Sequence, residues 1–247
     1  MTSNYEDIFA LRGSGYDLAM RRYPEARDEE FRQLVSRADI SQSARVADIP
    51  AGGGYLRDYL PADSTWLGHE PCTSFTSHSV QVSASDHLLP LPWNDSYIDV
   101  ALSLAGIHHI EDKLPLFSDI YRVTKPGGRL VVSDVAAGSA VASFLDDYVG
   151  AFNSTGHEGL YLDDRTVEDI SNTGWLVRSV EQVDYHWKFP GLDDMETFCN
   201  GLFDINRAKR GQTIQAINDL LSIDDLPGQT KGMRWSLMTI VADRPDL

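Results

Sequence analysis

Residues 45–59 read RVADIPAGGGYLRDY, and this stretch decides how the rest of the chain is interpreted. Its first residues, Arg45 to Ile49, form a short apolar run that predicts a buried strand. The three glycines Gly52, Gly53 and Gly54 then predict a tight turn into a helix. A strand that passes through glycines into a helix brings backbone N–H groups close to a ligand. The stretch therefore predicts a site for a polar ligand, although a tight turn alone also explains the glycines.

The glycine spacing differs from the dinucleotide pattern GxGxxG, because Tyr55 and Leu56 follow Gly54 and no later glycine completes the pattern. This departure disfavours a nicotinamide-dependent dehydrogenase, which stays as one alternative.

Composition limits the class of protein. The 247 residues, 42% apolar and 23% charged, suit one globular α/β domain over 1–247. A formal charge of −16 would repel a phosphate backbone, so nucleic acid is a poor partner. No run approaches the roughly 18 apolar residues of a membrane helix, and MTSNYEDIF does not read as a secretory signal. We therefore expect a cytoplasmic protein without a membrane span, and a homodimer is one assembly that remains open.

Apolar runs alternate with helical patterns along the chain. Strands are expected at 45–49, 65–68, 80–84, 96–106, 129–134, 175–189 and 234–242, and helices at 28–38, 55–60, 114–123, 139–153, 163–173, 195–203 and 212–221. This alternation predicts βαβ units and an open, mostly parallel sheet with helices on both faces. We expect an N-terminal helical arm over 1–26, a core over 27–138 and helical lid insertions at 139–160 and 190–231.

Acidic residues lie where these strands end. In an open α/β sheet, ligands bind beyond the carboxyl ends of the strands. Glu70 follows the second strand, Asp86 the third, and residues 104–109 follow the fourth. An acid at the tip of the second strand can accept two hydrogen bonds from a ribose diol. The set therefore predicts a ligand that contains a nucleoside.

With these motifs the sequence resembles the class I S-adenosylmethionine-dependent methyltransferases. The similar segments are VADIPAGGG (46–54), HEP (69–71), SASDHLLPLPWNDSYIDVALS (83–103) and LAGIHHIEDKLPLFSDIYRVTKPGGRLVVSD (104–134). The last segment resembles the small-molecule branch related to the quinone-biosynthesis C-methyltransferases. The resemblance implies a Rossmann-like seven-stranded sheet, S-adenosyl-L-methionine as cofactor and S-adenosyl-L-homocysteine as product.

The resemblance also implies roles for single residues. Asp48 and the backbone of Ala51, Gly52, Gly53 and Gly54 would hold the methionine portion of the cofactor. Glu70, followed by Pro71, would bind the ribose. Asp86 and the His87 backbone would bind the adenine, and Leu104 and Ala105 would line the methionine end. Each acid has a plain alternative, since Asp48 and Asp86 could cap local structure and Glu70 could be a solvated loop residue.

Histidines follow the fourth strand, near where the methyl group should emerge. Histidine is the side chain best suited to accept a proton near neutral pH, so His109 and His108 are the candidate bases, although the pair also fits a role in shaping the loop. The resemblance pairs His109 with an N-terminal tyrosine, for which Tyr16 is the candidate. Three further residues are expected near the substrate: Tyr148, His157 and Tyr161.

A zinc site built from His108, His109, Glu111 and His157 is disfavoured, because adjacent histidines at a strand end are expected to diverge. No metal is therefore expected.

The expected activity is methyl transfer to O, N or C of a small acceptor. Aromatic residues in the lid insertions and the preceding strand suggest an apolar or aromatic acceptor, although a lid also needs a core of its own. They are Phe144, Tyr148, Phe152, Tyr161, Trp187, Phe198 and Phe203. A protein that binds the cofactor without transferring methyl, as a regulatory subunit or a rearrangement catalyst, is the alternative from another class.

Overall fold

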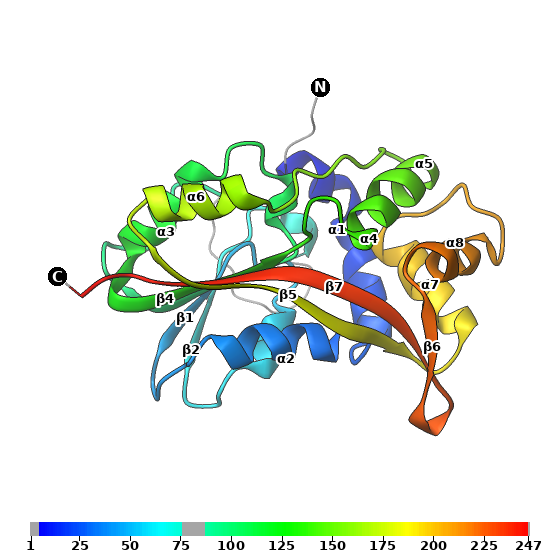
Figure 1. The fold of residues 1–247 in the computed structure, drawn as a ribbon, viewed down its shortest axis with the longest axis horizontal. Coiled ribbons are helices and arrows are strands. Elements are labelled where there is room, and N and C mark those ends of the chain that lie inside the picture. The colour runs from blue at the N-terminus through cyan, green and yellow to red at the C-terminus, as the bar shows by residue number, and fades with distance from the viewer. Residues whose placement is uncertain (1–4, 76–86, 247) are drawn as a thin grey trace.

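The computed structural model describes residues 5–75 and 87–246, and a seven-stranded sheet forms its centre (Figure 1). The strands are β1 (Arg45–Asp48), β2 (Thr65–Gly68), β3 (Ile98–Leu104), β4 (Thr124–Asp134), β5 (Leu176–Phe189), β6 (Ile223–Leu226) and β7 (Thr230–Asp243). Their order is β2-β1-β3-β4-β7-β5, with β6 paired to β7. Strand β7 runs antiparallel to β4, β5 and β6, whereas β2, β1, β3 and β4 are mutually parallel. The open, mostly parallel sheet is therefore confirmed.

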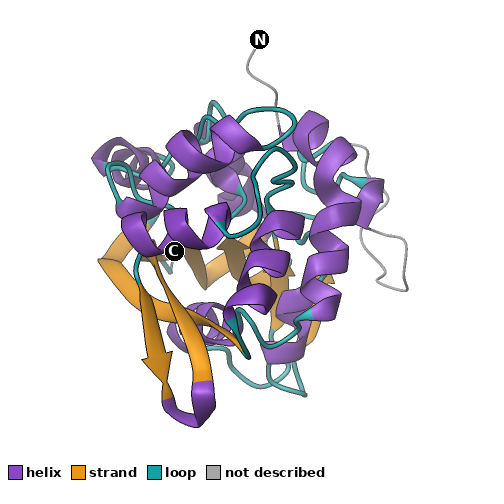
Figure 2. Ribbon diagram, turned by 90° about the vertical axis from the view of Figure 1, so that its right-hand side faces the viewer, coloured by secondary structure: helices purple, strands orange, loops and turns teal. Residues whose placement is uncertain are grey.

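Helices cover both faces of this sheet (Figures 1 and 2). The α-helices are α1 (Tyr5–Arg22), α2 (Asp28–Arg37), α3 (Leu114–Val123), α4 (Ala140–Ser143), α5 (Gly150–Phe152), α6 (Asp164–Asn172), α7 (Leu192–Leu202) and α8 (Gln212–Leu220). Short 3₁₀ turns are η1 (Tyr55–Tyr59), η2 (Thr73–Phe75), η3 (Ile107–His109) and η5 (Pro227–Gln229), and η4 (Phe144–Val149) is a π-helical turn. Helices α3 and α6 lie on one face, and α2 lies on the other (Figure 1).

Alternate residues of the central strands point into two separate cores. Val46 and Leu102 pack with Phe31 and Leu34 of α2 on one face. On the other face, Ala47 and Ala101 belong to the core that includes the buried side of α3 and Ile170 of α6. Successive strand residues face opposite sides, so strands buried on both faces need continuous apolar runs. This requirement explains why SYIDVALSLAG correctly predicted a central strand.

One predicted strand stays untested, and one strand of the sheet was not predicted. The expected strand at 80–84 lies outside the described residues, as does Asp86. The seventh described strand is β6, which lies inside the 190–231 segment that was expected to be a helical insertion. It forms a hairpin with β7, in which Leu226 pairs with Thr230. The two helices predicted in this segment are present as α7 and α8, and the sequence analysis missed β6, because IDDL gains its partner only from the strand that follows.

Helices α1, α7 and α8 gather beyond the carboxyl end of β1, with α4, η4 and α5 beside them (Figure 1). Helix α1 packs against α7 and η2, and α8 packs against α7 and η4. Close approach of α1 to η2 requires Gly13, because a Cβ atom there would lie 2.1 Å from the Ser74 Oγ. No helix among the described residues is long and apolar enough to cross a membrane.

Candidate functional site

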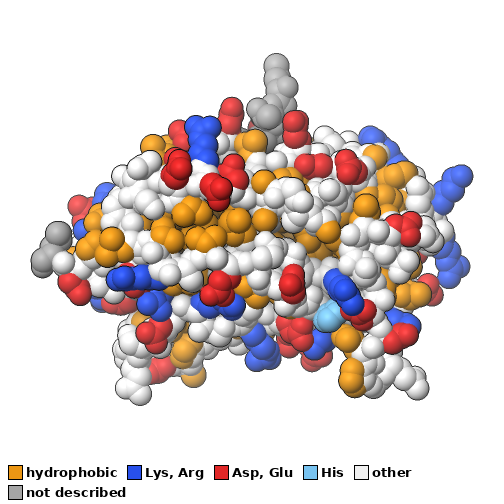
Figure 3. All heavy atoms as spheres, in the orientation of Figure 1, with side chains coloured by type: hydrophobic (Ala, Val, Ile, Leu, Met, Phe, Trp, Pro, Cys, Tyr) orange, Lys and Arg blue, Asp and Glu red, His pale blue; other side chains and the backbone are white. Residues whose placement is uncertain are grey.

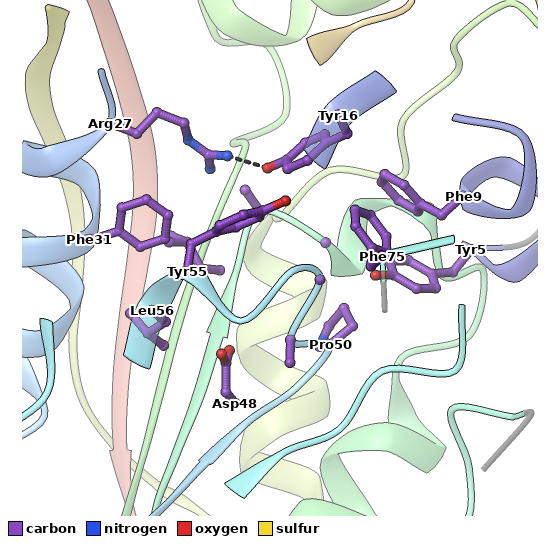
Figure 4. A pocket seen from close by; sticks show the side chains of 15 residues that line it. Tyr5, Phe9, Tyr16, Arg27, Phe31, Asp48, Pro50, Tyr55, Leu56 and Phe75 are labelled. Atoms are coloured by element: carbon purple, nitrogen blue, oxygen red, sulfur yellow. Dashed lines mark hydrogen bonds between the residues drawn. The ribbon is translucent and has the colours of Figure 1, made fainter. Parts of the chain in front are cut away.

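Two adjoining cavities lie under the α1 helix at the carboxyl ends of the central strands. The first, the glycine-turn cavity, has a volume of about 50 Å³ and lies at the carboxyl end of β1, where Asp48 and Pro50 line it (Figure 4). It is lined by Tyr5, Phe9, Tyr16, Arg27, Phe31, Asp48, Pro50, Ala51, Gly52, Tyr55, Leu56, Phe75, Leu104, Ala105 and Gly106. Four of the sequence-predicted cofactor residues thus share one wall with Asp48: Ala51, Gly52, Leu104 and Ala105.

Asp48 is the acidic group of this cavity. Its side chain ends β1, only 3% of the residue is exposed, and it accepts one hydrogen bond, from Trp66 Nε1 at 3.2 Å. Burial, opposed by this hydrogen bond and reinforced by the charge of Glu70, raises the pKa of Asp48 from 3.8 to about 7. A buried carboxylate without a cationic partner among the described residues favours a ligand that brings a positive charge.

The glycine turn is shaped by two positive φ angles. Gly52 has a φ of 52° and Gly54 a φ of 76°, conformations that side chains with a Cβ rarely adopt. Gly53 and Gly54 are buried and line a separate pocket beside Tyr59, not the glycine-turn cavity. Of this turn only Ala51 and Gly52 line the cavity, and their N–H groups already donate to the His69 carbonyl and to Glu70 Oε2.

Glu70, the residue expected to bind a ribose, is already satisfied within the protein. Its Oε2 accepts hydrogen bonds from the Gly52 N–H at 2.8 Å and the Tyr5 hydroxyl at 2.7 Å, and its Oε1 accepts from the Cys72 N–H at 2.8 Å. Burial raises the pKa of Glu70, although these hydrogen bonds oppose the rise. Glu70 is 2% exposed and lines neither cavity, so a ribose diol would have to displace the Tyr5 hydroxyl to reach it.

The adenine end of the predicted site is only partly described. Asp86 lies outside the described residues, and the His87 side chain is 77% exposed, with its Nδ1 4.0 Å from Glu6 Oε1. Pro71 is buried next to Glu70 but lines neither cavity.

The second cavity, the histidine cavity, shares Phe9, Tyr16, Arg27 and Ala105 with the first. Its remaining lining is Arg12, Glu30, His108, His109, Val135, Leu145, His157, Trp187, Leu202, Phe203 and Trp235. Three of the sequence-predicted residues, His108, His109 and His157, therefore meet around one space. The shared residues show that the two cavities adjoin.

His108 is held by a buried carboxylate. Its Nδ1 lies 2.6 Å from Asp134 Oδ1, and its backbone N–H donates to Asp134 Oδ2 at 3.1 Å. Although burial raises the pKa of Asp134, the charge and hydrogen bonds of His108 and neighbouring backbone N–H groups lower it overall. An imidazole that donates its Nδ1 proton to a carboxylate keeps Nε2 free to accept a proton, as a general base requires.

His157 is oriented in the same way. Its Nδ1 lies 2.9 Å from Asp146 Oδ1, which also accepts a hydrogen bond from the Tyr161 hydroxyl at 2.5 Å. Tyr161 therefore positions His157 and does not line the histidine cavity itself.

Burial, together with the charges of His108, His157 and Arg12, holds the pKa of His109 well below its usual range, so His109 is neutral at neutral pH.

The expectation that His108 and His109 diverge was wrong. The two rings lie 4.0 Å apart, and ligand nitrogens of His108, His109 and His157 lie within 4.8 Å of one another. The turn η3 directs both side chains to one side. The three side chains are close enough together to hold a metal ion, although the Arg12 cation in the same cavity would repel one.

Tyr16 lies between the two cavities. Its hydroxyl accepts a hydrogen bond from Arg27 (Figure 4), and no hydrogen bond joins it to His109. The Phe9 ring contacts both side chains instead, with ring centroids 6.1 Å from Tyr16 and 5.4 Å from His109. Tyr148 lines neither cavity, and its hydroxyl lies 2.9 Å from Thr213 Oγ1.

Stacked aromatic rings form one wall of the histidine cavity. Trp187 of β5 and Trp235 of β7 have ring centroids 4.2 Å apart, and Phe203 lies against both. Trp187 Nε1 donates to Glu30 at 2.6 Å. Of the aromatic residues expected around an acceptor, Trp187 and Phe203 line this cavity, whereas Phe144 and Phe198 are fully buried in the core.

Sequence reasoning missed Arg12, Asp134, Asp146 and Trp235. Asp134 is the last residue of a strand, so the rule that selected Glu70 and Asp86 could have selected it as well. The other three carry no comparable local signal: Arg12 and Trp235 line the cavity from α1 and β7, and Asp146 of η4 acts on it only by holding His157.

Comparisons with known proteins point to methyltransferases. Residues 48–132 match the family described as "Methyltransferase domain". The chain is 29% identical over 144 residues to a demethylmenaquinone methyltransferase of Streptomyces avermitilis, which covers 54% of this chain and 59% of that protein. The match thus spans less than two thirds of the relative's length.

Two solved structures share the fold. Phosphoethanolamine N-methyltransferase 2 of Haemonchus contortus, in complex with S-adenosyl-L-methionine, is 15% identical with a TM-score of 0.62, over 99% of this chain and 60% of that one. The [4+2]-cyclase SpnF is 17% identical with a TM-score of 0.59, over 89% of this chain and 81% of that one. At these identities the likeness concerns the fold alone.

Proposed function

We propose that this chain, which belongs to the class I S-adenosylmethionine-dependent methyltransferases related to the quinone-biosynthesis enzymes, methylates a small acceptor bound in the histidine cavity. The observation that carries the proposal is the junction of the two cavities at Tyr16 and Ala105. A cofactor cavity must adjoin an acceptor cavity for in-line transfer.

The residues of the glycine-turn cavity fit the cofactor. S-adenosylmethionine, when bound, supplies a methyl group on a positively charged sulfur. The buried carboxylate of Asp48 suits a cationic ligand, and the Ala51 and Gly52 backbone lies on the same wall. Glu70 would bind the ribose after the Tyr5 hydroxyl is displaced from its carboxylate. Asp86 and His87 would bind the adenine.

The histidines are proposed to accept the proton of the acceptor. His108 is the better-oriented base, because Asp134 holds its Nδ1 and leaves Nε2 for the acceptor. His109, kept neutral by its surroundings, lines the same cavity and is the second candidate. Tyr16 is proposed to separate the cofactor and acceptor groups rather than to pair with His109. His157 would contact the acceptor, and Tyr161 would act through Asp146.

The acceptor is proposed to be small and apolar or aromatic, because Trp187, Trp235 and Phe203 form a wall of the histidine cavity. The N-terminal arm (1–26) and the insertions at 139–160 and 190–231 are proposed to act as a lid over the histidine cavity.

Product mass spectrometry would decide whether the acceptor is methylated at O, N or C. Light scattering would decide whether the protein assembles as a homodimer. Acidic and basic side chains alternate on the face in Figure 3, which does not present a basic stripe for nucleic acid.

Two measurements test the proposal. Calorimetric titration should give S-adenosylmethionine binding well below millimolar concentration, and the absence of such binding would refute it. Incubation with a panel of phenols, quinols and amines should then release S-adenosylhomocysteine. His108→Ala and His109→Ala should lower turnover while cofactor affinity stays unchanged. If both variants keep the full rate, positioning alone drives transfer.

A second candidate is a protein that binds the cofactor and catalyses a rearrangement without transfer. The fold similarity to a [4+2]-cyclase favours keeping it. Formation of S-adenosylhomocysteine with any acceptor would exclude it.

A further inference from the structure

A buried arginine faces the histidine cavity without a partner. Arg12, in the middle of α1, is 8% exposed and lines this cavity but not the glycine-turn cavity. Its Nε is buried and makes no hydrogen bond, and across residues 5–75 and 87–246 no hydrogen bond or ion pair to its guanidinium is found. Few cationic side chains are left in this condition, because an unpaired buried charge costs several kcal/mol.

The other charges around the cavity are already balanced. Arg27 makes a bidentate ion pair with Glu30, with N···O distances of 2.5 and 2.9 Å. Asp134 and Asp146 are each bound to a histidine. Asp204 influences Arg12 electrostatically, and burial still leaves the Arg12 pKa below its usual value. The charge of Arg12 is therefore the one that the cavity lining leaves uncompensated.

We propose that Arg12 binds an anionic group of the methyl acceptor, so that the acceptor is a small organic acid with an apolar or aromatic body. This inference rests on the proposed function, since it names the chemical class of the acceptor in the same cavity. A planar guanidinium matches a carboxylate or a phosphate through two parallel hydrogen bonds. The aromatic wall of Trp187 and Trp235 would take the apolar body.

Such an anchor would also orient the acceptor. Arg12 comes from α1, whereas the histidines come from η3 and the loop after α5, and Ala105 marks the junction with the cofactor cavity. An acid held by Arg12 is fixed at one end, which limits the ways in which its nucleophile can face the junction. Arg12 is thus a binding residue for the acceptor rather than a base.

The test uses the full chain saturated with S-adenosylhomocysteine and three matched probes. Phenylacetate, phenyl phosphate and phenylacetamide are titrated by calorimetry or by ligand NMR. We expect at least one of the two anions to bind about tenfold or more tightly than the amide, and the tighter anion identifies carboxylate or phosphate as the recognised group. Arg12→Met should remove this preference, and Arg12→Lys should retain part of it.

Arg22→Met is the matched control, because it removes the same charge from an exposed position of the same helix. It should leave the preference intact. The proposal is overturned if neither anion binds more tightly than the amide at concentrations up to about 10 mM, or if Arg12→Met keeps the preference. It is also overturned if Arg12→Met weakens S-adenosylhomocysteine binding as strongly as anion binding, since Arg12 would then serve the carboxylate of the cofactor.

A stability measurement makes the test independent of the probes. Without ligand, Arg12→Met should melt at the same temperature as the wild type or higher, because it removes an unpaired buried charge. A clearly lower melting temperature would show that Arg12 supports the fold instead. Failure of S-adenosylhomocysteine to bind the wild type would refute the proposed function, whereas the anion titration could still be read in the ligand-free protein.

Discussion

Replacement of Asp48 by asparagine should stabilise the ligand-free protein and weaken cofactor binding. The Asp48 carboxyl is buried, and its pKa is raised from 3.8 to about 7. Because one pKa unit corresponds to about 1.36 kcal/mol, ionised Asp48 costs the folded state roughly 4 kcal/mol at pH 8. Asparagine keeps an oxygen that can accept the Trp66 hydrogen bond but carries no charge.

The stabilisation expected from Asp48→Asn depends on pH. The folded pKa lies above the unfolded one, so the folded protein binds the extra proton between these values and loses stability as pH rises through about 7. At pH 5.5 the folded form is largely protonated, and the cost falls to roughly 2 kcal/mol. The gain from Asp48→Asn should therefore be about twice as large at pH 8 as at pH 5.5. These values are upper limits, because water entry relaxes burial.

Urea unfolding at the two pH values measures the gain, with Asp63→Asn as a control that removes the same charge from an exposed position. Calorimetry should show that Asp48→Asn weakens S-adenosylmethionine binding by about tenfold to a hundredfold, as expected for loss of a charged contact. The reasoning is refuted if Asp48→Asn is less stable than the wild type at pH 8, or if the gain does not change with pH.

Three further outcomes follow from the site. Tyr5→Phe removes the hydroxyl bound to Glu70 and should tighten S-adenosylmethionine binding several-fold by calorimetry; weaker binding would show that Tyr5 supports the ribose site instead. Asp134→Asn should lower turnover by about a hundredfold or more at unchanged cofactor affinity, because His108 loses the carboxylate that sets its tautomer, and an unchanged rate would remove His108 as the base. Glu30→Gln leaves Arg27 in a buried site without its ion-pair partner and should lower the free energy of unfolding by about 3 kcal/mol in urea, whereas Glu25→Gln, at an exposed position, should change it little.

The strands and the turn beside the glycine-turn cavity could be predicted from the sequence because their signals are local. A parallel strand that is buried on both faces needs an apolar run, and the turn after β1 needs glycine at positive φ. Asp48 and Leu104 follow from the same logic, since the carboxyl ends of parallel strands meet at one edge of the sheet. The sequence therefore determined the fold class and one wall of the glycine-turn cavity.

Tertiary structure alone decided what lines the histidine cavity. Arg12 is an ordinary helix residue in the sequence, and only the packing of α1 beside α7 and η2 buries it without a partner. His157 contacts His108 because the loop after α5 returns across η3. The Tyr5 hydroxyl donates to Glu70 because α1 packs beside the end of β2. Such contacts join residues far apart in the chain, so they form only when the helices pack together. A local pattern of residues cannot predict that packing.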